Sequence, residues 1–273
     1  MSEKLQKVLA RSGIGSRRTM EQYIREGRIR VNGRPATLGD RVEPGARIHL
    51  DGRPLASRRL QPPRRRVLIY HKPVGELTTR ADPQGRPTVF QRLPSLERGR
   101  WVAVGRLDIN TCGLLLLTTD GELANRLMHP RYRLPREYAV RVYGEVPEAT
   151  LQRLRDGVEL EDGPARFDAV ERLSSTEGSS DWYRVVLHEG RKREVRRLWE
   201  SQGVRVSRLL RTRYGPVGLP RGMHQGELRE LQGADLQALL ATVGLDRPPA
   251  VPAGEPARRP GAGRRRPARA RKT

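Results

Sequence analysis

A stretch rich in proline and arginine, residues 54–66, constrains the fold of this chain more than any other feature. It contains the sequence RRLQPPRRR, and consecutive prolines resist compact structure and favour extended linkers. The end of the chain, residues 246–273, has six prolines, nine basic residues and two acidic ones, which leaves too little apolar surface to fold. We therefore expect a small unit at 1–60, a larger unit at 66–245 that moves relative to it, and a disordered basic tail at 246–273.

Positive charge dominates the composition. The 273 residues include 54 Lys and Arg against 31 Asp and Glu, a formal net charge of +23. Such a surplus favours a polyanionic partner, because basic side chains that displace condensed counterions gain affinity from ion release. Solubilising surface charge is the alternative, but a surplus of this size favours nucleic acid.

Several classes of protein are disfavoured. No window approaches the roughly 18 apolar residues of a membrane span, and the charged N-terminus MSEKLQKVLARSG lacks a secretory apolar core. A single cysteine excludes an internal disulfide and suits a reducing cytoplasm. Cysteine and histidine form no cluster with metal-ligand spacing, so no metal site is expected.

Residues 1 to about 55 have the pattern of two helices followed by a hairpin. Apolar side chains at 5, 8 and 9 share one helical face, and Ser16 is a good N-cap for a second helix that buries Met20, Tyr23 and Ile24. Residues 28–33 alternate as a strand does and end in Asn-Gly, a hairpin turn signal, and residues 46–50 alternate again.

From Val67 the sequence becomes globular. Strand-like runs and helical patterns do not alternate strictly, which predicts an α+β fold with a mixed, mostly antiparallel sheet flanked by helices. The strand-like runs are 67–70, 101–104, 114–117, 138–142 and 182–187, and the helical candidates are 122–128, 149–155, 194–202 and 234–242.

One aspartate stands between a basic residue and the most apolar run of the chain, in GRLDINTCGLLLLTTDG (105–121). Asp108 lies on the connection between two expected strands, where scaffolds often present reactive groups. Its carboxylate equally fits an Asx-type turn that accepts backbone N–H bonds, and the local sequence leaves both interpretations open. Leu114 to Leu117 are expected in the core.

Two sets of motifs resemble known families. KLQKVLARSGIGSRR and GRIRVNG resemble the S4 RNA-binding domain. The GRLD segment, together with YHKPVG (70–75), REYAV (136–140) and EGRKREVRR (189–197), resembles the pseudouridine synthases, and the S4 block narrows this to their RsuA branch. TCG, PQGRPTVF and DGELANRLMHP resemble most the members that act on large-subunit ribosomal RNA, although the branch usually has serine where Cys112 stands.

The resemblance implies that uridine in 23S ribosomal RNA becomes pseudouridine: the N1–C1′ bond breaks, the uracil turns and C5 rejoins C1′. Asp108 would be the essential carboxylate, attacking C1′ or abstracting the 2′ proton, and the sequence does not choose between these routes. Arg196 would pair with Asp108, and Tyr138 would stack on the base and help to move the C5 proton. No redox change occurs, so no cofactor is expected.

Further basic residues are expected to bind RNA. Arg106 would fill the gap left by the extruded uridine, because enzymes that act on a stacked base hold the stack apart. Arg197 would meet phosphate or pack, and the basic tail would add non-specific affinity. The remaining candidates are Arg17, Arg18 and Arg28 in the S4 unit, and Lys72, Arg191, Lys192 and Arg193 as phosphate contacts.

Cys112 and His129 are expected to be structural. A cysteine four residues past Asp108 suggests the nucleophile of pyrimidine methylation, but no glycine-rich methyl-donor turn follows a strand. His129 lacks a base or metal partner in the sequence and is expected to support or cap the fold.

Two functional hypotheses follow. The first is a cytoplasmic, monomeric isomerase that acts on 23S ribosomal RNA or a large-subunit assembly intermediate, with small-subunit ribosomal RNA or tRNA as alternative substrates within the family. The second is a non-catalytic S4-type ribosome-assembly factor, which explains the charge and residues 1–55 but not the ordered motifs beyond them.

Overall fold

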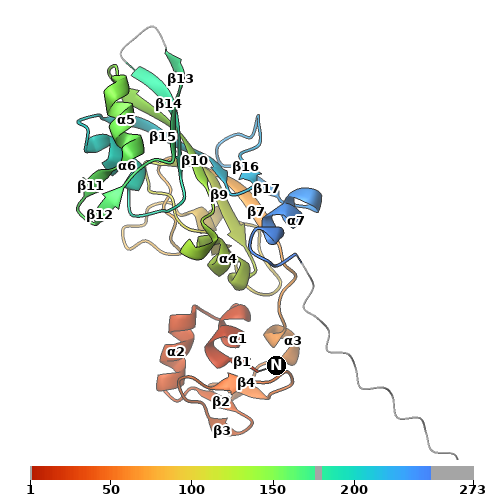
Figure 1. Ribbon diagram of the computed structural model, residues 1–273. Helices are drawn as coiled ribbons and strands as arrows, with labels where there is room; N and C mark the ends of the chain where they lie inside the picture. The colour runs from red at the N-terminus through yellow and green to blue at the C-terminus, as the bar shows by residue number, and fades with distance from the viewer. Residues whose placement is uncertain (1, 176–179, 247–273) are drawn as a thin grey trace, which may run out of the picture.

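The computed structural model describes residues 2–175 and 180–246, which form an S4-like part and a larger part (Figure 1). In the first, α1 (Leu5–Arg11) and α2 (Arg17–Arg25) share a core with a sheet of order β3-β2-β5-β6. Ser16 caps α2, as predicted, by accepting a hydrogen bond from the Thr19 N–H at 2.9 Å. The strands are β1 (Glu3–Lys4), β2 (Ile29–Val31), β3 (Arg34–Pro35), β4 (Arg41–Val42), β5 (Ile48–Leu50) and β6 (Arg53–Pro54).

The segment predicted to be an extended linker is partly folded. It includes the short helix α3 (Ser57–Leu60), whose Leu60 is buried in the N-terminal core. Arg65 donates to the Asp120 carboxylate at 2.8 Å. Residues 61–66, which hold the two consecutive prolines, lie in no helix or strand, as expected of a linker, whereas α3 departs from that expectation because Leu60 enters a core.

The larger part contains a nine-stranded sheet, mixed and mostly antiparallel as predicted. Its order is β13-β14-β10-β15-β9-β7-β17, with β16 beside β15 and β8 beside β9; only the β9–β15 pairing is parallel. The strands are β7 (Val67–Lys72), β8 (Val102–Ala103), β9 (Cys112–Thr118), β10 (Arg136–Tyr143), β13 (Ala169–Ser175), β14 (Ser180–Leu187), β15 (Val206–Tyr214), β16 (Val217–Gly218) and β17 (Leu228–Glu230), and β11 (Val158–Leu160) pairs with β12 (Gly163–Ala165) beside the sheet.

Helices cover both faces of this sheet (Figure 1). The apolar run Leu114–Leu117 alternates between the two faces and is fully buried, as expected of core residues. The helices α5 (Glu148–Asp156) and α6 (Glu194–Glu200) cover one face, and α4 (Gly121–Met128) and α7 (Gly233–Ala241) cover the other. The predicted tail beyond Asp246 lies outside the described residues.

No helix within residues 2–175 and 180–246 is long and apolar enough to cross a membrane.

Candidate active site

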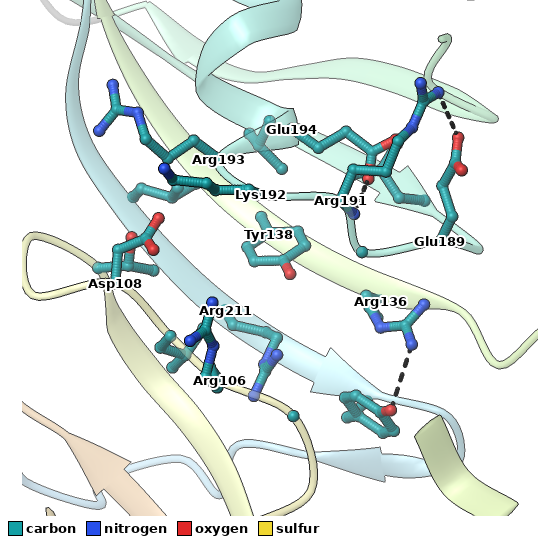
Figure 2. Close-up of a pocket in the computed structure, with 18 of the residues that line it drawn as sticks. Arg106, Asp108, Arg136, Tyr138, Glu189, Arg191, Lys192, Arg193, Glu194 and Arg211 are labelled. Carbon is teal, nitrogen blue, oxygen red and sulfur yellow. Dashed lines mark hydrogen bonds and ion pairs between the residues drawn. The ribbon is translucent and has the colours of Figure 1, made fainter. Parts of the chain in front are cut away.

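The Arg-Leu-Asp triplet directs its side chains alternately inward and outward. Leu107 is 6% exposed and packs in the core covered by α5 and α6. The Thr78 hydroxyl fixes its backbone, donating to the Leu107 carbonyl at 2.9 Å and accepting from its N–H at 3.2 Å. Arg106 and Asp108, on either side, are exposed and line a cleft (Figure 2).

Five consecutive backbone carbonyls of this loop, residues 107–111, accept hydrogen bonds. The donors come from three other segments of the chain as well as from the loop itself, so the backbone is fixed from several sides. They are Thr78 Oγ1 to Leu107, Lys72 Nζ and the Thr111 N–H to Asp108, the Gly75 N–H to Ile109, Arg196 Nη2 to Asn110, and Lys72 Nζ to Thr111.

The Asp108 carboxylate itself is left available. No described residue donates a hydrogen bond to it, which argues against the Asx-turn interpretation. A rigid backbone that presents an unpaired carboxylate to a cleft is the arrangement expected of a reactive group.

Lys72 holds the backbone of this loop from the interior of the protein. Its side chain is fully buried on β7, and Nζ donates to the carbonyls of Pro73, Asp108 and Thr111 at 2.9, 3.1 and 2.9 Å. Three acceptors match the three N–H groups of an ammonium. Burial lowers the pKa of Lys72 to about 8. Because its charge is enclosed by backbone carbonyls, Lys72 is poorly placed for the predicted phosphate contact and well placed to hold this loop.

Arg196 supports the same loop from α6. It is 8% exposed, and it donates from Nη1 to the Val206 carbonyl at 3.1 Å and from Nη2 to the Asn110 carbonyl at 2.9 Å. The predicted direct ion pair with Asp108 is not formed between these two described residues. Burial lowers the pKa of Arg196, and the attraction of Asp108 acts in the opposite direction, so the two charges lie within electrostatic reach.

The central strands bring Tyr138 to the same cleft. Tyr138 lies on β10, Asp108 precedes β9, and β15 lies between them in the sheet. Both side chains line the cleft, so the pairing of β10, β15 and β9 brings them to one site. Gly113 makes this possible: a Cβ there would lie 2.3 Å from the Arg211 carbonyl oxygen, so β9 and β15 approach closely only because residue 113 is glycine.

The cleft has a volume of about 450 Å³ and a mostly basic wall (Figure 2). Tyr138 is 8% exposed, and its phenol oxygen has no hydrogen-bond partner among the described residues. The charged residues of the wall, besides Asp108, are Arg106, Arg136, Glu189, Arg191, Lys192, Arg193, Glu194 and Arg211.

Arg211 is a buried cation that the sequence analysis missed. It is 2% exposed on β15; Nε donates to the Leu114 carbonyl at 2.7 Å, while neither terminal nitrogen bonds to a described residue. Its guanidinium carbon lies 5.2 Å from the Tyr214 ring centroid, and that of Arg136 lies 5.1 Å from it. A buried guanidinium without a carboxylate partner is costly and is expected to meet an acceptor from a ligand.

The loop before α6 has bound and free cations. Arg191 is held within the protein by Glu194, Glu189 and the β11–β12 turn, which leaves it poorly placed for the predicted phosphate contact. Lys192 and Arg193 are exposed at the cleft, and Arg193 also pairs with Glu200 at 3.1 Å.

Two further side chains complete this loop. Arg197 packs through a bidentate pair with Asp162 at 2.8 and 2.9 Å, which is one of the two predicted alternatives. Glu194 is 3% exposed, and burial, together with the neighbouring Glu189, raises its pKa to about 7.

The other candidates do not line the cleft. Arg17 and Arg18 are exposed on α2, whereas Arg28 forms a bidentate pair with Asp51 at 2.8 and 2.7 Å. Cys112 is half-buried and burial raises the pKa of its thiol, which disfavours a thiolate nucleophile. His129 Nδ1 accepts from the Arg131 N–H at 3.2 Å, in line with a capping histidine.

The described residues contain no group of three or more His, Cys, Asp or Glu side chains arranged to hold a metal ion.

Known proteins resemble this chain over both parts. A family model described as RNA pseudouridylate synthase matches residues 66–201, and the S4 domain model matches residues 3–48. Ribosomal large subunit pseudouridine synthase B of Escherichia coli (strain K12) is 59% identical over 247 residues, which are 90% of this chain and 84% of that protein. The protein of the same name from Pseudomonas aeruginosa is 57% identical over 252 residues, 92% of this chain and 65% of that protein.

A solved structure described as a crystal structure of pseudouridylate synthase supports the fold. It aligns with a TM-score of 0.61 at 24% identity, covering 86% of this chain and 99% of that one. The chain belongs to the RsuA family of pseudouridine synthases, in which an S4 domain precedes the catalytic domain. It is therefore an isomerase, and the first of the two functional hypotheses is correct at the level of reaction class.

Proposed function

We propose that this enzyme isomerises a uridine of large-subunit, 23S ribosomal RNA and that Asp108 is its essential catalytic group. The observation that carries the proposal is an unpaired carboxylate facing a basic cleft, on a loop held at five consecutive carbonyls. Groups fixed in this way act on the transition state without a reorganisation cost. The names of relatives at 57–59% identity support large-subunit RNA as the target.

In the proposed reaction the N1–C1′ bond breaks, the uracil turns, and a C5–C1′ bond forms. C5 then loses its proton and N1 gains one, so the product is an isomer of the substrate and no oxidant or cofactor is consumed. Asp108 either attacks C1′ to give a glycosyl ester or removes the 2′ proton to give a glycal. Both routes need a carboxylate that reaches the ribose, which its exposed position in the cleft provides.

The surrounding residues have separate proposed roles. Tyr138 stacks on the uracil and assists the C5 proton, since base–aromatic stacking contributes about 1–3 kcal/mol. Arg106 fills the gap left by the flipped uridine. Lys192 and Arg193 bind phosphates beside it. Arg196 acts by positioning, through the Asn110 carbonyl.

The RNA context is also proposed. The enzyme acts as a monomer in the cytoplasm, on free 23S ribosomal RNA or a large-subunit assembly intermediate. A purely RNA-binding protein would have no use for a rigid loop that presents a carboxylate to RNA, because a carboxylate repels phosphate.

The test compares Asp108→Asn with the wild-type protein on a 23S ribosomal RNA transcript. Carbodiimide adducts followed by primer extension report each pseudouridine. We expect conversion to fall by about 10³-fold or more, while RNA affinity stays within about twofold. Asp168→Asn is the matched control, an exposed carboxylate that pairs with His188 at 2.7 Å. Conversion by Asp108→Asn at the wild-type rate would overturn the catalytic role, and RNA from cells lacking the enzyme would locate the target uridine.

A further inference from the structure

The S4 domain and the catalytic domain touch at a point where two glycines meet. A Cβ on Gly13 would lie 2.6 Å from the Gly99 carbonyl oxygen, so the two turns approach with no space for a side chain. Nearby, Lys7 Nζ of α1 lies 3.7 Å from Glu122 Oε2 of α4. Figure 1 shows α4 on the side of the catalytic domain that faces the S4 domain. The S4 domain and the catalytic domain are therefore in direct contact here, and we call this region of contact the seam.

A cavity of about 320 Å³ lies in this seam, with residues of both domains and of the linker around it. Three of its basic side chains are neutralised locally: Lys7 by Glu122, Arg11 by Glu3 at 2.8 Å, and Arg65 by Asp120 at 2.8 Å. The charged residues around it are Lys7, Arg11, Arg17, Arg65, Arg100, Asp120 and Glu122.

Two of these cations have no partner. Neither Arg17 of the S4 domain nor Arg100 of the catalytic domain forms a hydrogen bond or an ion pair with any described residue. Arg100 is half-buried, and its burial, followed by the repulsion of Arg80 and Arg17, lowers its pKa. Unpaired like charges from two domains therefore face one cavity, and the free protein bears the cost of their repulsion.

We propose that Arg17 and Arg100 together bind one phosphate of the RNA backbone, in a site shared between the S4 domain and the catalytic domain. An anion between the two guanidinium groups replaces repulsion with two charge-assisted contacts. The assignment of the anion to RNA rests on the proposed function. Because each domain supplies one cation, binding of the phosphate also holds the catalytic cleft at a set position relative to the S4 domain.

The first experiment measures equilibrium binding of a large-subunit ribosomal RNA fragment to full-length Arg17→Gln, Arg100→Gln and the double variant. Each single substitution is expected to weaken binding about fivefold to tenfold and to lower the salt slope by about 1. The double variant loses less than the product of the single losses, because both side chains grip one phosphate. Arg229→Gln, an exposed cation on the edge strand β17, is the matched control. Unchanged binding of Arg100→Gln, or losses that multiply, would overturn the shared site.

A second variant, Arg100→Glu, distinguishes an RNA-binding role of Arg100 from a purely structural one. Arg100→Glu places a carboxylate beside Arg17 and Arg80, so we expect a higher melting temperature than that of Arg100→Gln and weaker RNA binding. Equal melting temperatures and equal affinities of the two variants would show that the cations are not juxtaposed. Uridine conversion by the wild-type protein is measured separately, so failure of the isomerase assignment leaves the binding comparison interpretable.

Discussion

The catalytic cleft and the S4 surface are both basic, but they hold their charges in different ways. Lys72 and Arg196 lie behind the loop that carries Asp108, and Arg211 lines the cleft; all three are at most 8% exposed and donate hydrogen bonds to backbone carbonyls. On the S4 domain, Arg17 and Arg18 are exposed and have no partner among the described residues. Buried cations fix geometry, whereas exposed cations offer charge to a polyanion. Substitutions in the first set should therefore change the chemical step, and those in the second should change affinity and its salt dependence.

The largest expected effect after loss of Asp108 itself comes from Lys72→Met. The variant roughly keeps the packing volume but removes the Nζ hydrogen bonds to three carbonyls, two of them in the loop that carries Asp108; of these, the Asp108 carbonyl keeps the Thr111 N–H. A loop displaced by about 1 Å costs roughly 10²-fold in rate, so we expect single-turnover conversion to fall by that factor or more. RNA affinity should stay within about twofold. If RNA affinity falls while the conversion rate is unchanged, Lys72 acts as an RNA contact, and the division between buried cations that fix geometry and exposed cations that bind RNA does not hold.

Arg211→Gln tests whether a buried cation that lines the cleft affects the reaction more than an exposed cation on the same strand. We expect conversion at saturating RNA to fall about tenfold to a hundredfold, because bound RNA is expected to supply an acceptor for the terminal nitrogens, which have none among the described residues. The control is Arg213→Gln, two residues along the same strand, whose side chain is 49% exposed and which should stay within twofold. Equal effects of the two substitutions would mean that burial of the cation is irrelevant.

The sequence predicted the elements that follow simple patterns. The strand-like runs of β7, β10 and β14 and the helical patterns of α4 to α7 lie within a few residues of their expected bounds. The central strand β15 was not predicted, because Arg208, Arg211 and Arg213 interrupt its apolar alternation. The surroundings of β15 explain Arg211, whose guanidinium has a carbonyl acceptor within the sheet and the cleft beside it. Local sequence does not contain that information.

The site was predicted in outline for a different reason. Motif resemblance brought Asp108, Tyr138 and Arg196 together, and the structure places Asp108 and Tyr138 on one cleft with Arg196 behind the loop. The resemblance did not distinguish a cation that faces the solvent from one that holds backbone, and it did not predict that Lys72 is buried. That distinction depends on burial by distant segments, here the carbonyls of residues 108 and 111.

Arg18→Gln tests the S4 side of the comparison with a smaller effect. An exposed guanidinium that meets phosphate contributes through counterion release, so we expect affinity to fall about threefold to fivefold and the salt slope to fall by about 1. Conversion at saturating RNA should be unchanged. Arg28→Gln is expected to have less effect, because Arg28 already pairs with Asp51. Titrations at several salt concentrations measure both variants, and a lower rate at saturation for Arg18→Gln would contradict the division of roles.

The smallest expected effect concerns Glu194, the buried carboxylate beside the cleft. Burial raises its pKa from 4.5 to about 7, so the folded state binds a proton more tightly than the unfolded chain does. Between pH of about 4.5 and 7 the folded state therefore carries more protons, and the free energy of unfolding must decline as pH rises through this window. In Glu194→Gln this contribution is absent, so its melting temperature should fall less than that of the wild type between pH 5 and 7. The difference should be a few degrees, since about 1–2 kcal/mol corresponds to that change in a domain of this size. If the melting temperatures of the two proteins change with pH in parallel, Glu194 is ionised throughout this window because Arg191 holds its charged form. The cleft would then keep its acidic as well as its basic side chains charged.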